Sequence, residues 1–353
     1  GGWAWLMFGA SCALSAGFVL LFTPPEWSQT GLLVWLAGAL VLVYAAHSVL
    51  SVCYLTWGAR LTDDVTARAR VTAWREAFGL VGVVVASVLP AVWVTQQGAR
   101  VGYQWFAWVF AVLLLVSLAC TLRWSAKPKL ASHQARQSLR EALAPAAMRR
   151  VLYFYLLNAI SVAIPATLVL FFIDDVVQAP GYAGLFLGLY FLAGMLALPV
   201  WVMLAARIGK ARAWLIGSAL AALSLLCAAW VGAGDVYFYS VVCVLAGAAL
   251  GADVALPPAM LADAIPPTHR QSTGLYFGIW VLIGKLALAI AAGLALPALQ
   301  ALQYQPGQPE SALALSRMYA FLPLLFKGLA MMVLFLQFPR SCLTRVDSRK
   351  ESS

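Results

Sequence analysis

Long apolar runs constrain this chain more than any other feature of its sequence. A helix needs about 20 apolar residues to cross the roughly 30 Å hydrocarbon core of a bilayer, and ten runs come close to or exceed that length. Lipid admits only helices or closed barrels, and strand-length segments of alternating polarity are absent from the sequence. We therefore predict an all-α polytopic membrane protein with helices at 3–22, 31–58, 78–96, 104–123, 151–173, 182–206, 213–231, 236–262, 274–298 and 316–338.

Composition excludes the main alternative classes of protein. The 353 residues are 63% hydrophobic and 10% charged, whereas roughly a quarter of residues are charged in soluble domains. The sequence has no HExxH, GxSxG, Walker A or CxxC motif, and His47, His133 and His269 are far apart. We therefore predict that the protein is not an enzyme and has no metal or cofactor site.

The placement of basic residues explains the net charge of +10. Nineteen of the 23 Lys and Arg lie on one side of the predicted helices, whereas only Arg100 and Arg317 lie in loops on the other side. Cytoplasmic loops carry such an excess of Lys and Arg. We predict that both termini are cytoplasmic, that the protein lies in a plasma or inner membrane, and that its partner is the lipid bilayer rather than nucleic acid.

A long polar segment at 124–150 divides the chain into two unequal parts. Four predicted helices lie in 1–123 and six in 151–339, and the cytoplasmic tail is 340–353. Comparison of the chain with itself at an offset of 200 residues aligns three pairs at equivalent topological positions, namely Leu61 with Leu261, Asp63 with Asp263 and Arg70 with Arg270.

Parallel repeats of this kind are typical of transporter halves related by an axis along the membrane normal. The first half then lacks two helices relative to the second, so about ten of an expected twelve are present. Because residue 1 is Gly and no basic leader precedes the first apolar run, we interpret the chain as truncated at its N-terminus.

Two sequence blocks resemble a known family. The segment CYLTWGARLTDD at 53–64, followed by Arg68, Arg70 and Arg75, is similar to the signature PY-x-x-x-G-A-E-L-T-x-D … ERT … R of the glycoside-pentoside-hexuronide:cation symporters. A second block, with ADA at 262–264, TGLYFG at 273–278 and then Lys285, resembles their A-D … T-G … G … K segment.

This resemblance implies a two-half helical bundle of the major facilitator type. It also implies symport of a sugar, glycoside or uronide with H⁺ or Na⁺ by alternating access, in a protein we expect to be monomeric. The sequence departs from the family at Cys53 for Pro and Arg60 for Glu, and Ser51 takes the place of a cation-binding Asp of melibiose permease. The choice between H⁺ and Na⁺ therefore stays open.

Four titratable residues lie deep inside predicted helices. At 1.5 Å per residue, Asp253, Lys285, Lys327 and His47 each lie about 15–18 Å from the nearest cytoplasmic loop. Charges at this depth are costly, and they mark substrate or ion pathways more often than not. We predict a polar switch formed by Asp253 and Lys285, the alternative being a permanent structural ion pair. His47 is a candidate proton-coupling group, because an imidazole titrates near neutral pH, and the alternative is a simple hydrogen bond.

Several further residues are candidates for sugar contact. The resemblance implies that Arg75 lies near the sugar and that Lys285 helps to bind cation and sugar, although Arg75 is also a typical positive-inside anchor. Asn158 offers hydrogen bonds to hydroxyls, with interhelical packing as the alternative. Aromatic faces suit the C–H surfaces of sugars, and the candidates on the signature helices are Tyr54, Trp57, Tyr276 and Trp280. Trp214 is interpreted instead as a membrane-interface residue.

Charged residues at equivalent places in the two halves suggest a cytoplasmic gate. Salt bridges between halves would hold one state and break in the other; the alternative is a solvated, positive-inside loop with weak pairs. The gate candidates are Asp63, Asp64, Arg68, Arg70, Asp263 and Arg270.

Pairs of glycines four residues apart predict close contacts between helices. These pairs are Gly184 with Gly188, Gly247 with Gly251, and Gly274 with Gly278.

Two other functions fit the sequence. One is a transporter of the same fold for another substrate, such as a lysolipid. The other is a fragment without transport activity, or a membrane interaction protein derived from a transporter.

Overall fold

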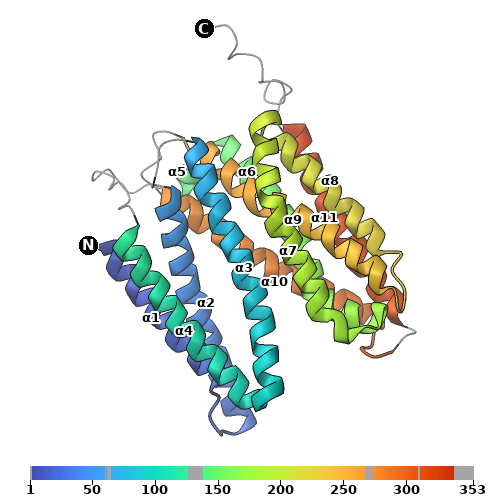
Figure 1. The fold of residues 1–353 in the computed structure, drawn as a ribbon. Coiled ribbons are helices and arrows are strands. Elements are labelled where there is room, and N and C mark those ends of the chain that lie inside the picture. The colour runs from blue at the N-terminus through green and yellow to red at the C-terminus, as the bar shows by residue number, and fades with distance from the viewer. Residues whose placement is uncertain are drawn as a thin grey trace, which may run out of the picture. The chain divides into compact units, whose positions relative to one another are not determined.

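A computed structural model describes residues 2–59, 61, 65–125, 138–266, 273–308 and 311–337. These residues form helices joined by turns and short loops, and they contain no strand (Figure 1). The all-α prediction is therefore confirmed. The elements in chain order are α1 (Gly2–Phe22), α2 (Gln29–Ala59), α3 (Val65–Gln97), α4 (Ala99–Trp124), α5 (Leu139–Leu143), α6 (Ala146–Phe171), the π-helix η1 (Phe172–Val177), the 3₁₀-helix η2 (Pro180–Tyr182), α7 (Ala183–Ile208), α8 (Lys210–Ala228), α9 (Val236–Ala264), α10 (Thr273–Ala301) and α11 (Ala312–Gln337).

Each of the ten predicted spans overlaps one of the long helices. Within the described residues, nine helices are long and apolar enough to cross a membrane. The predicted span 78–96 falls on α3, where the described apolar stretch, Ala77–Ala86, is shorter.

The chain forms two compact units. The first, unit 1, comprises 1–64, 85–134 and 273–281, and the second, unit 2, comprises 65–84, 135–272 and 282–353. Helices α3 and α10 each contribute to both units. The predicted boundary between two halves at 124–150 remains a prediction.

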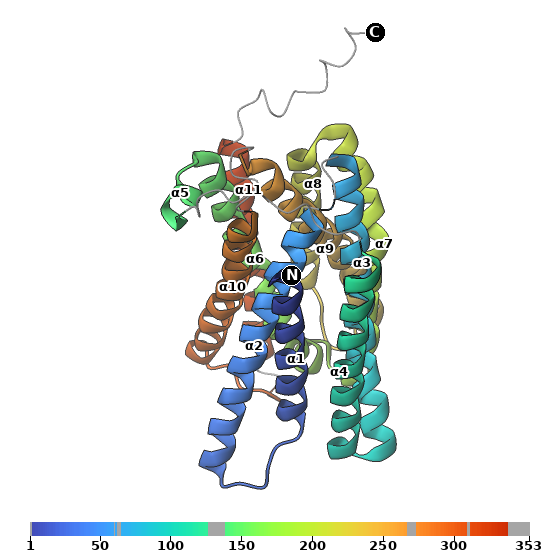
Figure 2. The ribbon, with the colours of Figure 1, turned by 90° about the vertical axis from the view of Figure 1, so that its left-hand side faces the viewer.

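In unit 1, α1 packs against both α2 and α4, and Figure 2 shows α1 and α2 side by side. Aromatic rings join α1 to α4, with the Phe18 and Phe110 ring centroids 4.2 Å apart. At the other end of α1, a small buried cluster forms from Met7, Cys53, Trp57 and Leu118. Burial of apolar surface contributes about 25 cal/mol per Å² to the free energy of folding where that surface is removed from water.

In unit 2, α9 packs against α7 and α8, and α11 packs against α6 and α8. Figure 1 shows α7, α8 and α9 running alongside one another. A large buried cluster fills the space between these helices at the end of α6, and it includes Ile164, Leu168, Phe172 and Tyr239. The Phe172 ring stacks on Tyr319 with centroids 4.1 Å apart, which ties the end of α6 to α11.

Glycines allow the closest approach within unit 2. A Cβ atom added to Gly247 on α9 would overlap the backbone carbonyl oxygen of Tyr190 on α7, and one on Gly251 would lie 2.9 Å from the Gly194 oxygen. A Cβ atom added to Gly217 on α8 would likewise overlap the methyl group of Ala252 on α9. The predicted contact at Gly247 and Gly251 is thus present, whereas among the described residues none lies within 4 Å of a Cβ added at Gly184, Gly188 or Gly278.

The close contact of α7 with α9 yields a prediction. Gly247→Ala should lower the free energy of unfolding by about 1–3 kcal/mol, because the added methyl group forces two backbones apart. The measurement is denaturant unfolding of the purified protein in detergent micelles. Gly188→Ala is the control and should leave stability unchanged or slightly higher, because alanine favours the helix. Equal effects of the two changes would contradict the close-contact interpretation.

The loop between α10 and α11 is held to η1 by hydrogen bonds. The Tyr304 hydroxyl donates a hydrogen bond to Asp175 of η1, and the Gly307 backbone N–H donates to the other carboxylate oxygen at 3.0 Å. Burial, and next the Asp175 carboxylate, raise the pKa of Tyr304 above its ordinary value. The hydroxyl is therefore held in its protonated, donating form.

Tyr304→Phe should lower the free energy of unfolding by about 1–3 kcal/mol near neutral pH, because the carboxylate loses a donor. A raised pKa means that this contribution is complete below the pKa of tyrosine in the unfolded chain, near 10, and is lost as the pH rises through the higher folded value. Unfolding of the substituted and unsubstituted proteins at pH 7 tests the change. Tyr237→Phe is the control, since Tyr237 is 91% exposed, and it should have no effect.

Candidate functional site

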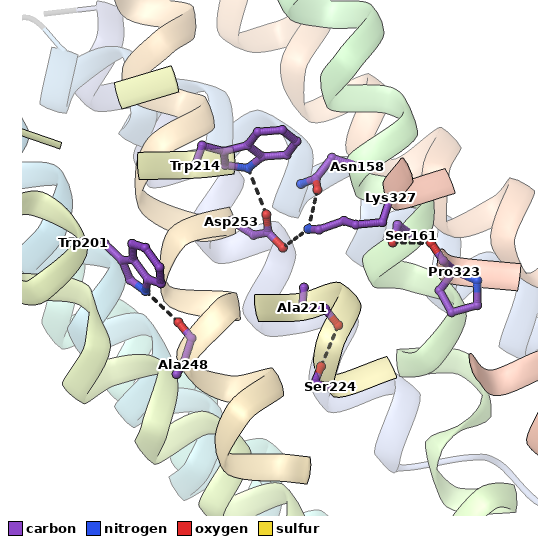
Figure 3. A network of polar contacts seen from close by, with 10 residues as sticks. All are labelled: Asn158, Ser161, Trp201, Trp214, Ala221, Ser224, Ala248, Asp253, Pro323 and Lys327. Atoms are coloured by element: carbon purple, nitrogen blue, oxygen red, sulfur yellow. Dashed lines mark hydrogen bonds and ion pairs between the residues drawn. The ribbon is translucent and has the colours of Figure 1, made fainter. Parts of the chain in front are cut away.

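The centre of unit 2 contains a buried ion pair. The Nζ atom of Lys327 on α11 lies 2.6 Å from Oδ2 of Asp253 on α9, and it donates a second hydrogen bond of 2.7 Å to Oδ1 of Asn158 on α6 (Figure 3). The Lys327 and Asp253 side chains are only 1% and 7% exposed. The two charges therefore depend on each other and on their hydrogen-bond partners rather than on solvent.

A tryptophan on a fourth helix completes the network. Trp214 on α8 donates its indole N–H to Oδ1 of Asp253 at 3.0 Å, and its ring centroid lies 5.5 Å from Nζ of Lys327. The ring is fully buried and packs against Phe154 at a centroid distance of 5.2 Å. Both carboxylate oxygens thus accept from donors, and the ammonium group has two oxygen acceptors and an aromatic face.

Helix length places the network deep in the predicted membrane region. Asp253 lies about 16 Å along the axis from Ala264 at the end of α9, and Lys327 lies about 15 Å from Gln337 at the end of α11. Each of the four helices contributes one side chain. These side chains form the four-helix network, which consists of Asn158, Trp214, Asp253 and Lys327. Breaking such a pair leaves a charge in an apolar interior and is costly.

A cavity of about 200 Å³ lies beside the network, and Asp253 and Lys327 form part of its wall. Its lining is mostly hydrophobic, with hydroxyl groups from Ser161, Ser224 and three tyrosines. Two of these tyrosines, Tyr239 and Tyr319, are buried and share a hydrogen bond of 3.2 Å between their hydroxyl groups. The wall of the cavity thus includes both the ion pair and tyrosine hydroxyl groups that lie nearer the beginning of α9 and of α11.

The structure brings together three predicted residues, Asp253, Lys327 and Asn158. It corrects the predicted pairing, however, because the cation bound to Asp253 is Lys327 rather than Lys285. Lys285 lies on α10 and is half-buried. A Cβ atom added to its neighbour Gly284 would lie 3.1 Å from the Tyr155 hydroxyl oxygen. Depth along a helix was predicted correctly for both lysines, but depth does not determine which way a helix faces.

Trp214 is the residue that the sequence interpretation missed. We predicted a membrane-interface tryptophan, whereas the indole is buried and bonded to Asp253. The two residues are 39 positions apart, so no local pattern connects them. The same holds for the cavity residues Tyr190, Tyr239 and Tyr319, which give no motif in the sequence.

The remaining sugar-contact candidates of unit 1 lie in varied surroundings. Tyr54 is 45% exposed, whereas Trp57, Tyr276 and Trp280 are buried. His47 is exposed, and its Nε2 lies 3.5 Å from the Ser51 hydroxyl. Their proposed roles remain predictions.

The gate candidates are only partly described. Asp63, Asp64 and Arg270 lie outside the described residues, as do the side chains of Arg68 and Arg70 on α3, while Arg75 is half-buried. Asp263 forms an ion pair of 2.5 Å with Lys210 at the start of α8, so this carboxylate links α8 to α9 within unit 2. The gate between halves remains a prediction.

Comparisons with known proteins fit this architecture. Residues 2–340 match the family described as MFS/sugar transport protein, and the chain therefore belongs to this family of the major facilitator superfamily. No curated protein matches the chain.

Solved structures of transporters share the fold. A bacterial homologue of the iron transporter ferroportin, in an outward-facing state, has a TM-score of 0.66 at 18% identity, covering 95% of this chain and 81% of its own. The fucose:proton symporter of E. coli has a TM-score of 0.65 at 13% identity, covering 93% and 84%. At these identities the likeness shows the fold alone. The family match, together with the nine membrane-length apolar helices among the described residues, makes this chain an integral membrane protein of a transporter class rather than an enzyme.

The buried pair yields a stability prediction. Lys327→Met should lower the free energy of unfolding by about 3–5 kcal/mol, because Asp253 is left as an unpaired buried charge. The combined change Asp253→Asn and Lys327→Met removes both charges and should cost less than Lys327→Met alone. Unfolding in detergent micelles measures both effects.

A matched control exists in a second ion pair of unit 2, which joins α8 to α9. Lys210 pairs with Asp263, but these side chains are 24% and 48% exposed. Lys210→Met should therefore cost only about 0–1 kcal/mol. If Lys327→Met were as mild as Lys210→Met, the buried pair would not carry the predicted weight in stability.

Proposed function

We propose that the protein is a secondary active transporter that moves a sugar, glycoside or uronide by alternating access, driven by the entry of H⁺ or Na⁺. The observation that carries this proposal is the ion pair of Lys327 and Asp253, buried inside the helices of a sugar-transport family member. Ionisable residues in the membrane interior are expensive, and they mark substrate or ion pathways.

The geometry supports a switch rather than a simple structural bridge. The pair borders a cavity, so a cation or a substrate can reach it without first unfolding a helix. A buried ion pair has two well-separated states, made and broken, and such bistable elements are suited to couple binding to rearrangement. Substrate and ion sites of transporters with this architecture lie at this depth.

The choice of a sugar substrate has three supports. The family is one of sugar transport proteins, and one structural neighbour is a fucose:proton symporter. The segments at 53–64 and 262–285 resemble the glycoside-pentoside-hexuronide:cation symporters. The predicted orientation with cytoplasmic termini and the monomeric state belong to the same proposal.

A second candidate function is transport of a substrate with an apolar part, such as a lysolipid. The observation that favours it is the mostly hydrophobic lining of the cavity in unit 2, where Val169, Phe186, Leu187 and Leu225 contribute. The homologue of an iron transporter among the structural neighbours is consistent with a fold that accepts other substrates.

Uptake into proteoliposomes tests the proposal. The purified protein is reconstituted, and entry of melibiose, L-fucose, D-galactose and D-glucuronate is measured under an imposed proton gradient or an imposed sodium gradient. We expect at least one sugar to accumulate, and a gradient of about tenfold in the driving ion sustains about tenfold accumulation at one ion per sugar.

Liposomes without protein, and liposomes whose gradient has been collapsed with an ionophore, provide the controls. Exchange of each sugar across the membrane without a gradient is measured in parallel. Absence of both exchange and accumulation for every sugar, together with uptake of lysophosphatidylcholine, would replace the sugar proposal by the second candidate.

A further inference from the structure

Resting on the proposed function, we infer that the driving ion is a proton and that Asp253 carries it, with Lys327 as the partner that Asp253 releases on protonation. The inference comes from the donors and acceptors of the four-helix network and from the cavity beside it.

The network offers few free acceptors to a metal cation, which needs several. Both oxygens of Asp253 accept hydrogen bonds, from Lys327 and Trp214, and Oδ1 of Asn158 accepts from Lys327. Asp253 is the only carboxylate among the described residues that line the cavity, and one acid balanced by one ammonium leaves no net negative charge. Hard cations are bound by several oxygen ligands, usually including carboxylates. Na⁺ would have to bind beside an ammonium group and share its single counter-ion.

A proton needs only one lone pair. It binds to Oδ2 of Asp253, and the ion pair with Lys327 breaks as the carboxylate becomes a neutral carboxyl group. Lys327 keeps its own protons, its hydrogen bond to Asn158 and its place over the Trp214 ring. The formal charge of the network changes from zero to +1, and release of the proton to the other side of the membrane restores the pair.

The remaining groups that face Asp253 and its cavity are neutral. They are Tyr190 on α7, Tyr239 and Cys243 on α9, and Tyr319 on α11, whereas α6 and α8 contribute Ser161, Ser224, Asn158 and Trp214. None of these side chains carries a second negative charge that would pair with Lys327 in place of Asp253. Protonation of Asp253 is therefore the change that frees the ammonium group.

The cavity has room for water that would bring a proton to Asp253. Its volume of about 200 Å³ exceeds the roughly 10–15 Å³ that one water molecule requires, and its wall includes the hydroxyl groups of two serines and three tyrosines. Ser161 donates its proton to the Pro323 carbonyl at 2.8 Å, so its oxygen still accepts a hydrogen bond from water. The Tyr239 and Tyr319 hydroxyls border the same space, in the part of the helices that lies away from Lys210 and Asp263.

The test measures proton movement and sugar accumulation together, with whichever of melibiose, L-fucose, D-galactose and D-glucuronate exchanges fastest. In the unsubstituted protein, sugar added to lightly buffered proteoliposomes should make the medium more alkaline. An inward proton gradient of about one pH unit should drive about tenfold accumulation, and a sodium gradient should drive none.

Asp253→Asn keeps the size of the side chain and one of the two oxygens that accept from Trp214 and Lys327, but it cannot carry a proton. It should lose accumulation and sugar-dependent proton uptake while sugar exchange stays within about threefold of the unsubstituted rate, a change of well under 1.4 kcal/mol. Asp235→Asn is the matched control, because Asp235 precedes the same helix α9 and its carboxylate accepts a hydrogen bond from the Gly232 backbone N–H in the adjoining loop. It should leave all three properties unchanged.

A second measurement needs no substitution. Dicyclohexylcarbodiimide reacts with protonated carboxyl groups in apolar surroundings, so its attachment to Asp253, mapped by peptide mass spectrometry, should increase as the pH falls and should abolish accumulation. Accumulation driven by sodium without proton movement would overturn the choice of ion. Full accumulation by Asp253→Asn would overturn the carrier. Both results would leave the transporter proposal standing, whereas failure of every sugar to exchange would remove that proposal itself.

Discussion

The ion pair of Lys327 with Asp253 is the interaction on which the rest of unit 2 depends. Lipid offers no water to a displaced charge, and an unpaired charge inside the helices costs several kcal/mol. Asn158 and Trp214 occupy the remaining hydrogen-bonding positions, so four helices must hold a common depth and a common rotation. This requirement links α6, α8, α9 and α11 more specifically than apolar packing alone, which many rotations of a helix can satisfy.

Close backbone contact makes that arrangement possible. Gly247 and Gly251 let α7 approach α9, and Gly217 lets α8 approach the same helix near Ala252. Because α8 lies so near, the indole of Trp214 reaches the Asp253 carboxylate. At the other end of the helices, the rings of Phe172, Tyr239 and Tyr319 pack together and close the bundle around the cavity.

The proposed transport mechanism uses the same residues that stabilise unit 2. The buried pair links α9 to α11 and borders the cavity, and in the proposed mechanism a proton on Asp253 breaks it. A carrier of this kind differs from a metal site, because it needs one lone pair instead of a shell of oxygens. The proposed proton coupling therefore follows from the presence of an ammonium group where a sodium site would need an additional acid.

The sequence by itself determined the secondary structure, the membrane setting and the position of each charged residue along its helix, because apolar length and helical rise are local quantities. It also indicated Asp253, Lys327 and Asn158 as candidates. Only the tertiary structure decided that Asp253 pairs with Lys327, 74 residues away, rather than with Lys285 at a similar depth. Partner choice depends on how each helix is rotated, and that is set by packing between helices distant in sequence. The same reason explains why Trp214, interpreted as an interface residue, proved to be part of the buried site.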